Sequence, residues 1–210
     1  MFKRVVPLKK EIIKKSIAAI PVIMLTTTLL ACGGGNASKL DTSSIEIKKD
    51  GSVISTLIED FSESYYSADE LRDMVENEVN SFIVAKGEGA AELKSLNIDD
   101  GKAKLVLSFS NTDNFNDFSN ETLIYETVTD AVLAGQLDVN TLVDKEGNPI
   151  APDRAATLSS QHVILSKTTN IIVAPYKIAY FYGKSKPIDK YMADFSENAE
   201  GELACIVLDK

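Results

Sequence analysis

The sequence is poor in the side chains on which many enzyme active sites depend. It holds one histidine, His162, and no tryptophan among 210 residues. A single imidazole excludes most zinc sites, Ser-His-Asp triads and Cys-His dyads. Because His162 opens an apolar strand pattern, we expect it to have a structural role. The absence of tryptophan also removes one common aromatic platform for sugars.

The sequence also lacks the short motifs that hold a reactive serine or a nucleotide. It contains no G-x-S-x-G and no S-x-x-K pattern, and no glycine-rich phosphate loop follows an expected strand. The sequence therefore disfavours serine-nucleophile chemistry and nucleotide use. We predict no catalytic residue, no metal site and no cofactor.

Long apolar runs are missing as well. Residues 16–30 form the main apolar stretch, but they include Pro21 and three consecutive threonines. A membrane-spanning helix needs about 20 apolar residues, so this stretch is too short and too broken to be one. A lysine-rich segment, 1–15, precedes it, which is typical of a secretory signal. An uncleaved anchor or an N-terminal core helix is the alternative.

The end of this stretch carries a motif. Residues 29–32 read LLAC, and a glycine-rich segment, GGGNAS, follows directly. The motif resembles the lipobox of bacterial lipoproteins. The resemblance implies a lipoprotein signal peptide over 1–31, lipidation of the Cys32 thiol, and a flexible tether over 32–43. It further implies a protein anchored to the membrane through the lipid on Cys32, at the extracytoplasmic face.

Without residues 1–31 the chain is strongly acidic. That segment holds six of the 22 Lys and Arg residues but one of the 31 Asp and Glu residues, so the remainder has a net charge of −14. Coulomb repulsion opposes binding to nucleic acid. We therefore predict no nucleic-acid partner, and an unknown surface protein or glycan instead.

Cys205 is the second of two cysteines. It alternates with Leu203 and Val207 in an apolar C-terminal run, so we expect a small buried apolar residue. If Cys32 is acylated on sulfur, the chain cannot form an intramolecular disulfide.

The pattern over 44–210 predicts a single α+β domain. Apolar runs flank Asp50-Gly51 and again flank the segment 99–101, and Asp-Gly pairs of this kind predict hairpins. Ser67 and Glu70 form a capping box at the start of a stripe of apolar residues that continues to Gly87. We expect a mainly antiparallel sheet of hairpins, with one long amphipathic helix over about 67–86 and one or two short helices packed on it.

Strand patterns recur along the rest of the domain. Strands are expected at about 44–49, 52–59, 91–98, 102–108, 122–126, 162–166, 171–174, 176–183 and 202–209, and a strand-turn-strand unit at 140–151. A brief helix is expected at 129–135, and a loop with one helical turn at 111–120. Residues 152–160 are polar and are expected to be irregular.

Three stretches of this domain carry a second resemblance: IEIKKDGSVISTLIEDF, YYSADELRDMVENEVNSF and GEGAAELKSLNIDDGKAKLVLSF. Together they resemble the ectodomain of uncharacterised lipoproteins of Gram-positive gut bacteria. The resemblance implies a membrane-anchored surface location and transfers no site residues.

The clearest candidate for binding is a row of aromatic residues late in the chain. Tyr176, Tyr180 and Tyr182, together with Ile178, occupy alternate positions and would share one face of a strand. An exposed tyrosine face could stack on sugar rings or on a peptide. The alternative is that this face packs against the helix or another strand.

Two acidic segments have some features of calcium loops. Asp144, Glu146 and Asn148 offer oxygen ligands at alternate positions, but Ala155 stands where an EF-hand has its bidentate glutamate. The segment 113–117 is similarly incomplete. We expect a turn at the first segment, and calcium binding at either stays open.

Paired carboxylates leave one enzymatic alternative. A glycoside hydrolase needs two suitably separated acids and no histidine. The candidates are Glu59, Asp60, Glu63, Asp99 and Asp100. The sequence thus favours a lipid-anchored binding or envelope-structural module without catalysis, with an envelope glycan hydrolase that uses two carboxylates as the alternative.

Overall fold

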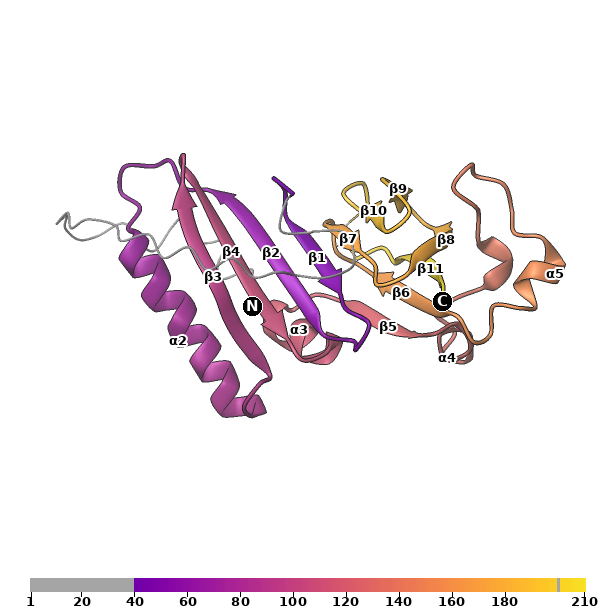
Figure 1. The fold of residues 1–210 in the computed structure, drawn as a ribbon, viewed down its shortest axis with the longest axis horizontal. Helices are drawn as coiled ribbons and strands as arrows, with labels where there is room; N and C mark the ends of the chain where they lie inside the picture. Colours follow the sequence, from indigo (N-terminus) through magenta and orange to yellow (C-terminus); the bar gives the residue numbers. More distant parts are fainter. Residues whose placement is uncertain (1–39, 200) are drawn as a thin grey trace.

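The computed structural model describes residues 40–199 and 201–210 (Figure 1). The expected signal peptide, Cys32 and most of the expected tether lie outside the described residues. The described part is built mostly from strands, with α2 towards one end of the molecule and α4 and α5 towards the other.

The described elements follow one another along the chain. The strands are β1 (Ser44–Ile47), β2 (Val53–Asp60), β3 (Ala91–Asp99), β4 (Lys102–Phe109), β5 (Leu123–Thr127), β6 (His162–Ser166), β7 (Ile171–Val173), β8 (Lys177–Tyr182), β9 (Lys186–Pro187), β10 (Met192–Asp194) and β11 (Ala204–Asp209). The helices are α2 (Ala68–Lys86), α3 (Thr112–Ser119), α4 (Val128–Leu133) and α5 (Pro152–Ala155), with a 3-10 turn at Val139–Thr141.

These strands form two sheets. The first has seven strands in the order β3-β4-β2-β1-β7-β10-β9, and the second has four in the order β5-β6-β11-β8. Most neighbours are antiparallel, but β1 and β7 run parallel, with Ile45 opposite Ile172. This parallel pair joins the N-terminal hairpins to the last third of the chain.

The predicted fold class is wrong. The sequence suggested one sheet of local hairpins under a long amphipathic helix, whereas the described chain is a mixed α/β structure with two sheets. Helix α2 does not cover the first sheet, because it packs on the edge strand β3 and buries only Leu71, Val75 and Val79. Near the end of the helix, Phe82 and Ile83 are half-buried against the core, whereas Val84 is 89% exposed.

The ends of α2 follow from local chemistry. Ser67 is the N-cap, and its hydroxyl oxygen accepts a hydrogen bond from the Glu70 amide at 3.3 Å. Gly87 ends the helix, and its amide donates to the Ile83 carbonyl. The N-cap at Ser67 is therefore confirmed, although the helix packs differently from the prediction.

Both Asp-Gly hairpins are confirmed, but their turns differ. Asp100 and Gly101 both have positive φ, at 47° and 70°, as a type I′ turn requires. In the first hairpin only Gly51 has positive φ, at 85°, and the Asp50 carboxylate accepts hydrogen bonds from Ser52. The first turn is therefore held by a side chain and not by two left-handed residues.

Several other boundaries were predicted incorrectly. The expected strand-turn-strand unit at 140–151 is mostly irregular, because Val143 makes only single bridges to Pro149 and Phe181. The polar segment after it includes the short helix α5. The segment 111–120, expected to be a loop with one helical turn, contains the eight-residue helix α3, which is capped by the Asn111 side chain.

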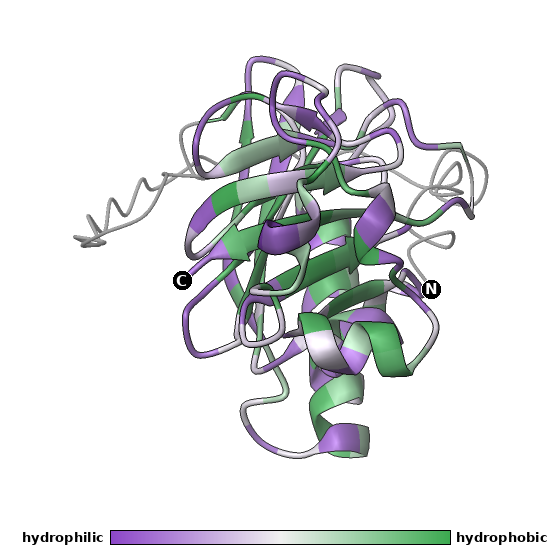
Figure 2. Ribbon diagram, turned by 90° about the vertical axis from the view of Figure 1, so that its right-hand side faces the viewer, coloured by the Kyte–Doolittle hydropathy of each residue, from purple (hydrophilic) through white to green (hydrophobic). Residues whose placement is uncertain are grey.

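The hydrophobic core reaches both sheets. One cluster joins residues of the first sheet, such as Ile45 and Leu107, to Ile206 and Leu208 of the second. The opposite face of the second sheet forms a separate cluster that includes Cys205. The second sheet is thus buried on both sides, and Figure 2 shows hydrophobic residues along its strands and hydrophilic residues in the outer loops.

Candidate functional site

A depression lies where the chain enters β1. It has a volume of about 410 Å³ and is lined by residues of the entering segment, the end of β2 and the β3–β4 turn: Asp41, Thr42, Ser43, Ile58, Glu59, Asp60, Ser62, Asp100, Gly101 and Lys102. The Ser43 side chain holds the entering segment to β2, since its hydroxyl donates to the Ile58 carbonyl and accepts from the Ile58 amide. The lining is rich in carboxylates and hydroxyls.

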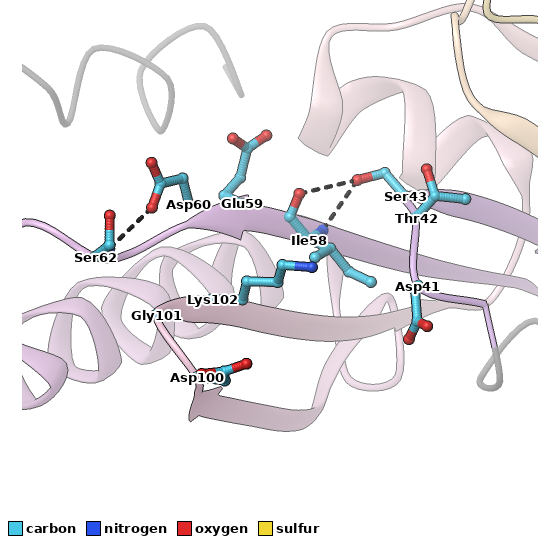
Figure 3. Close-up of a pocket in the computed structure, with 10 residues that line it drawn as sticks. All are labelled: Asp41, Thr42, Ser43, Ile58, Glu59, Asp60, Ser62, Asp100, Gly101 and Lys102. Carbon is cyan, nitrogen blue, oxygen red and sulfur yellow. Dashed lines mark hydrogen bonds between the residues drawn. The ribbon is translucent and has the colours of Figure 1, made fainter.

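The depression brings together three of the five acids proposed for glycan hydrolysis. Glu59, Asp60 and Asp100 all line it, but each is exposed. In Figure 3 the side chains of Glu59 and Asp60 lie on one side of Lys102 and that of Asp100 lies on the other. The carboxylates therefore do not converge on a point. Within residues 40–199 and 201–210, no group of three His, Cys, Asp or Glu side chains is placed to hold a metal ion.

An aromatic turn lies next to this depression. The Phe61 amide donates to the Gly101 carbonyl, which fixes the start of the turn against the depression. Phe61 stacks on Tyr66 with ring centroids 4.8 Å apart, and Tyr65 meets Tyr66 edge-on at 4.9 Å. Tyr65 is 44% exposed. Sequence reasoning overlooked this group, although the adjacent tyrosines in SESYYS could have indicated it.

The three tyrosines proposed as a binding face do not share one. A β-bulge in β8 places Tyr180 opposite Val207 but Ile178 opposite Leu208, so Ala179 is an extra residue. The alternation of β8 side chains between the two faces of the sheet is therefore broken at Ala179. Tyr176 packs with the core between the sheets, whereas Tyr180 packs with the cluster on the opposite face of the second sheet. Tyr182 is 39% exposed.

Tyr176 instead belongs to a group of aromatic and lysine side chains. The ammonium groups of Lys49 and Lys210 lie 5.4 Å and 5.5 Å from the centroid of its ring. The rings of Tyr125 and His162 lie beside them, with centroids 5.0 Å apart. We call these five residues the aromatic–lysine cluster.

Burial and neighbouring charge perturb the titration of this cluster. Burial raises the pKa of Tyr125 to about 12, with a smaller contribution from Tyr176. Burial, and then the positive charge of Lys210, lower the pKa of His162. Tyr125 is therefore protonated and His162 neutral at physiological pH. His162 was expected to be only structural, and its half-buried ring beside Tyr125 could not be anticipated from the strand pattern.

The acidic segments considered for calcium use their side chains within their own folds. The Asp144 carboxylate accepts hydrogen bonds from the amides of Glu146 and Asn148, and the Asn148 bonds are the main reason that its pKa is lowered. In α3, the Asn116 side chain bonds the backbone of Leu123. Asp144 thus holds a turn, as expected, and Asn116 holds α3 against β5.

Cys205 is completely buried, as the sequence predicted. Burial raises the pKa of its thiol to about 12, which suppresses the thiolate that reacts or binds metal. Burial also raises the pKa of Glu121 and Glu126, and each has a buried oxygen without a hydrogen-bond partner. Neither of these carboxylates lines the depression.

Comparison with known proteins gives no family. No family model matches the chain, and neither a curated protein nor a solved structure matches it. In residues 40–199 and 201–210, no helix has both the length and the apolar character needed to span a bilayer.

Proposed function

We propose that this chain is a lipid-anchored extracytoplasmic module that binds a surface glycan or a surface protein without catalysis. The observation that carries the proposal is the open depression at the entry to β1, with its exposed carboxylates and hydroxyls next to an aromatic turn. Such oxygens accept hydrogen bonds from sugar hydroxyls or from a peptide, and aromatic faces add stacking. No nucleic-acid partner is proposed, because the chain is acidic.

The exposure of the acids favours binding over catalysis. A glycoside hydrolase keeps one carboxylic acid protonated by an apolar or like-charged environment. Here Glu59, Asp60 and Asp100 are open to solvent, and Lys102 lines the same depression. Solvated carboxylates beside an ammonium group are suited to hydrogen bonding and charge recognition.

The anchor rests on the LLAC motif at residues 29–32. A lipid on Cys32 would hold the protein at the outer surface of the cell membrane. Thr42 and Ser43, at the end of the proposed tether, line the depression. The depression would therefore lie at the end of the domain from which the tether leaves.

Lipidation is tested by exchanging the two cysteines separately. The full chain is expressed in a bacterium with a lipoprotein pathway and labelled with a palmitate analogue. Cys32→Ala is expected to abolish labelling and to release the protein from membranes, while Cys205→Ala, which removes the other cysteine, keeps both. Unlabelled wild type, or labelled Cys32→Ala protein that stays in the membrane, would contradict the anchor.

Binding is tested with the full chain against an array of envelope glycans and a panel of purified surface proteins. The double variant Glu59→Gln, Asp100→Asn is compared with Glu76→Gln, Glu88→Gln, which removes two exposed carboxylates of α2 and the loop after it. We expect the first pair to weaken binding about tenfold or more, equal to about 1.4 kcal/mol, and the control pair to leave it unchanged. Equal effects of both pairs would show that only net charge matters.

A glycan hydrolase remains the second candidate because Glu59, Asp60 and Asp100 line one depression. Incubation of the chain with envelope glycan would then release new reducing ends, and Glu59→Gln or Asp100→Asn would stop the release. If wild type releases none, while it binds the same glycan, the binding function stands alone.

A further inference from the structure

Five separate segments meet at the aromatic–lysine cluster. Lys49 lies in the β1–β2 turn, Tyr125 in β5, His162 at the start of β6, Tyr176 just before β8, and Lys210 just after β11. The contacts of Tyr176 with Lys49 and Lys210 bring the β1–β2 turn, the start of β8 and the end of β11 together. The cluster shares no residue with the depression.

Contacts join the members of the cluster in two groups. Lys49 and Lys210 both lie over the Tyr176 ring, and His162 packs on Tyr125. The two groups are near enough for the charge of Lys210 to contribute to the lowered pKa of His162. The Lys210 amide donates to the Gln161 side-chain oxygen at 2.8 Å, which fixes Lys210 beside His162. The cluster is thus built by tertiary contacts and is not a chance row along one strand.

The ammonium groups of Lys49 and Lys210 are the charged part of the cluster. Among the described residues, neither Lys49 nor Lys210 takes part in an ion pair. Glu46 is paired with Lys48. Asp209 stands opposite Lys177 in the sheet. The pKa of Arg154 is raised mainly by a hydrogen bond with the Tyr180 hydroxyl, and the charge of Asp209 adds a smaller contribution. The cluster therefore keeps local positive charge on an acidic protein.

The uncharged members add hydrogen-bond donors. Tyr125 and Tyr176 present hydroxyl groups on half-buried rings. His162 Nδ1 is buried without a partner, which favours the neutral form protonated at Nε2, because an unpaired buried N–H would be costly. A second proton at Nδ1 would leave a buried donor unpaired. Two ammonium groups, two hydroxyls and one ring N–H together suit an acceptor-rich, negatively charged ligand.

We propose that the aromatic–lysine cluster binds an acidic saccharide, with the sugar carboxylate between Lys49 and Lys210 and the sugar hydroxyls on the tyrosines and His162. The aromatic rings favour a saccharide over a bare anion, since they can pack against the C–H groups of a sugar. The whole chain carries a net charge of −9, which favours a short ligand with few charges over a dense polyanion. The proposal goes beyond the function proposed above and does not require the depression.

The experiment measures binding of digalacturonic acid to the full chain by calorimetry at low salt. Its dimethyl ester, which keeps both rings but removes the charges, and sodium sulfate, which keeps only charge, serve as ligand controls. We expect saturable binding of digalacturonate and binding about tenfold weaker, or more, for the ester and for sulfate. Equal binding of sulfate would reduce the cluster to a general anion site and overturn the proposal.

Protein variants locate the binding. Lys49→Gln with Lys210→Gln, and separately Tyr176→Leu, are expected to weaken digalacturonate binding about tenfold or more. Lys177→Gln is the matched control, because Lys177 is an exposed lysine adjacent to Tyr176 but opposite Asp209. Circular dichroism checks that each variant is folded. No saturable binding by wild type, or full binding by the double lysine variant, would overturn the proposal.

Discussion

At the scale of single residues, Cys205 shows how burial controls reactivity. Its thiol has no solvent exposure, and burial raises its pKa from 9.0 to about 12. A raised pKa means that the folded state holds the proton more tightly than the unfolded state. The contribution of the protonated Cys205 thiol to the free energy of unfolding is therefore complete below pH 9 and is lost as the pH rises towards about 12.

The prediction concerns thiol labelling in the Cys32→Ala background, where Cys205 is the only cysteine. At mildly alkaline pH the folded chain should react with a thiol reagent far more slowly than a denatured sample, because thiolate and access are both missing. The labelling rate is measured from the absorbance of the thiolate that the reagent releases when it reacts with Cys205. Rapid labelling of the native protein would contradict the buried position.

Ser67 is the second residue with a measurable role. Ser67→Ala removes the acceptor for the Glu70 amide and should cost about 1 kcal/mol in the free energy of unfolding. Ser81→Ala, at an exposed position inside the same helix, is the control, and it should cost nothing because alanine has the higher helix propensity. Urea unfolding measures both. Equal values for the two variants would argue against the cap.

At the scale of elements, we expect alanine to have different effects on stability at two glycines that have similar backbone angles. Gly183 and Gly147 have φ of 78° and 86°. A Cβ on Gly183 would lie 2.8 Å from the Cβ and 3.0 Å from the Cα of Ala204 in β11, whereas a Cβ on Gly147 would meet nothing within 4 Å. Only Gly183 is required for close approach as well as for its backbone angle.

Alanine at each position separates these two requirements. Gly147→Ala should cost about 1 kcal/mol, the penalty for a left-handed backbone. Gly183→Ala should cost a further 1–3 kcal/mol or so, since β11 cannot move aside without disturbing the second sheet. Thermal and urea unfolding measure the difference. Similar losses for both would mean that β8 and β11 adjust freely.

The sequence predicted elements well where the cause is local. Asp-Gly pairs mark both hairpins, and Ser67 marks the start of α2. It did not predict β9 and β10, which are two and three residues long and too short to show a pattern. The bulge at Ala179 was also hidden, because it depends on the register with β11. That bulge is why the three tyrosines do not share a face.

At the scale of the whole molecule, the arrangement depends on contacts between distant segments. The parallel pairing of β1 with β7 joins residues more than a hundred positions apart. The alternation of apolar and polar residues within either strand does not indicate which other strand it pairs with. The same limit applies to the candidate sites. Tyr176 was selected from the sequence, but Lys49, Tyr125 and Lys210 are brought to it only by the tertiary fold.

The shared core predicts that the two sheets unfold together. Ile172 of β7 is completely buried between β1 and β10, in the cluster that also contains Ile206 and Leu208 of the second sheet. Ile172→Ala should therefore cost about 2–5 kcal/mol and shift a single transition. Ile188→Ala, at a position that is 47% exposed, should change stability by less than about 0.5 kcal/mol.

Hydrogen exchange resolves whether this coupling holds. In Ile172→Ala protein, amides of β6 and β11 should lose protection together with those of β2 and β4, because removal of the buried side chain weakens the core that both sheets share. If the amides of the second sheet keep their protection while the first sheet opens, the two sheets are independent units. The parallel β1–β7 pair would then contribute little to cooperativity.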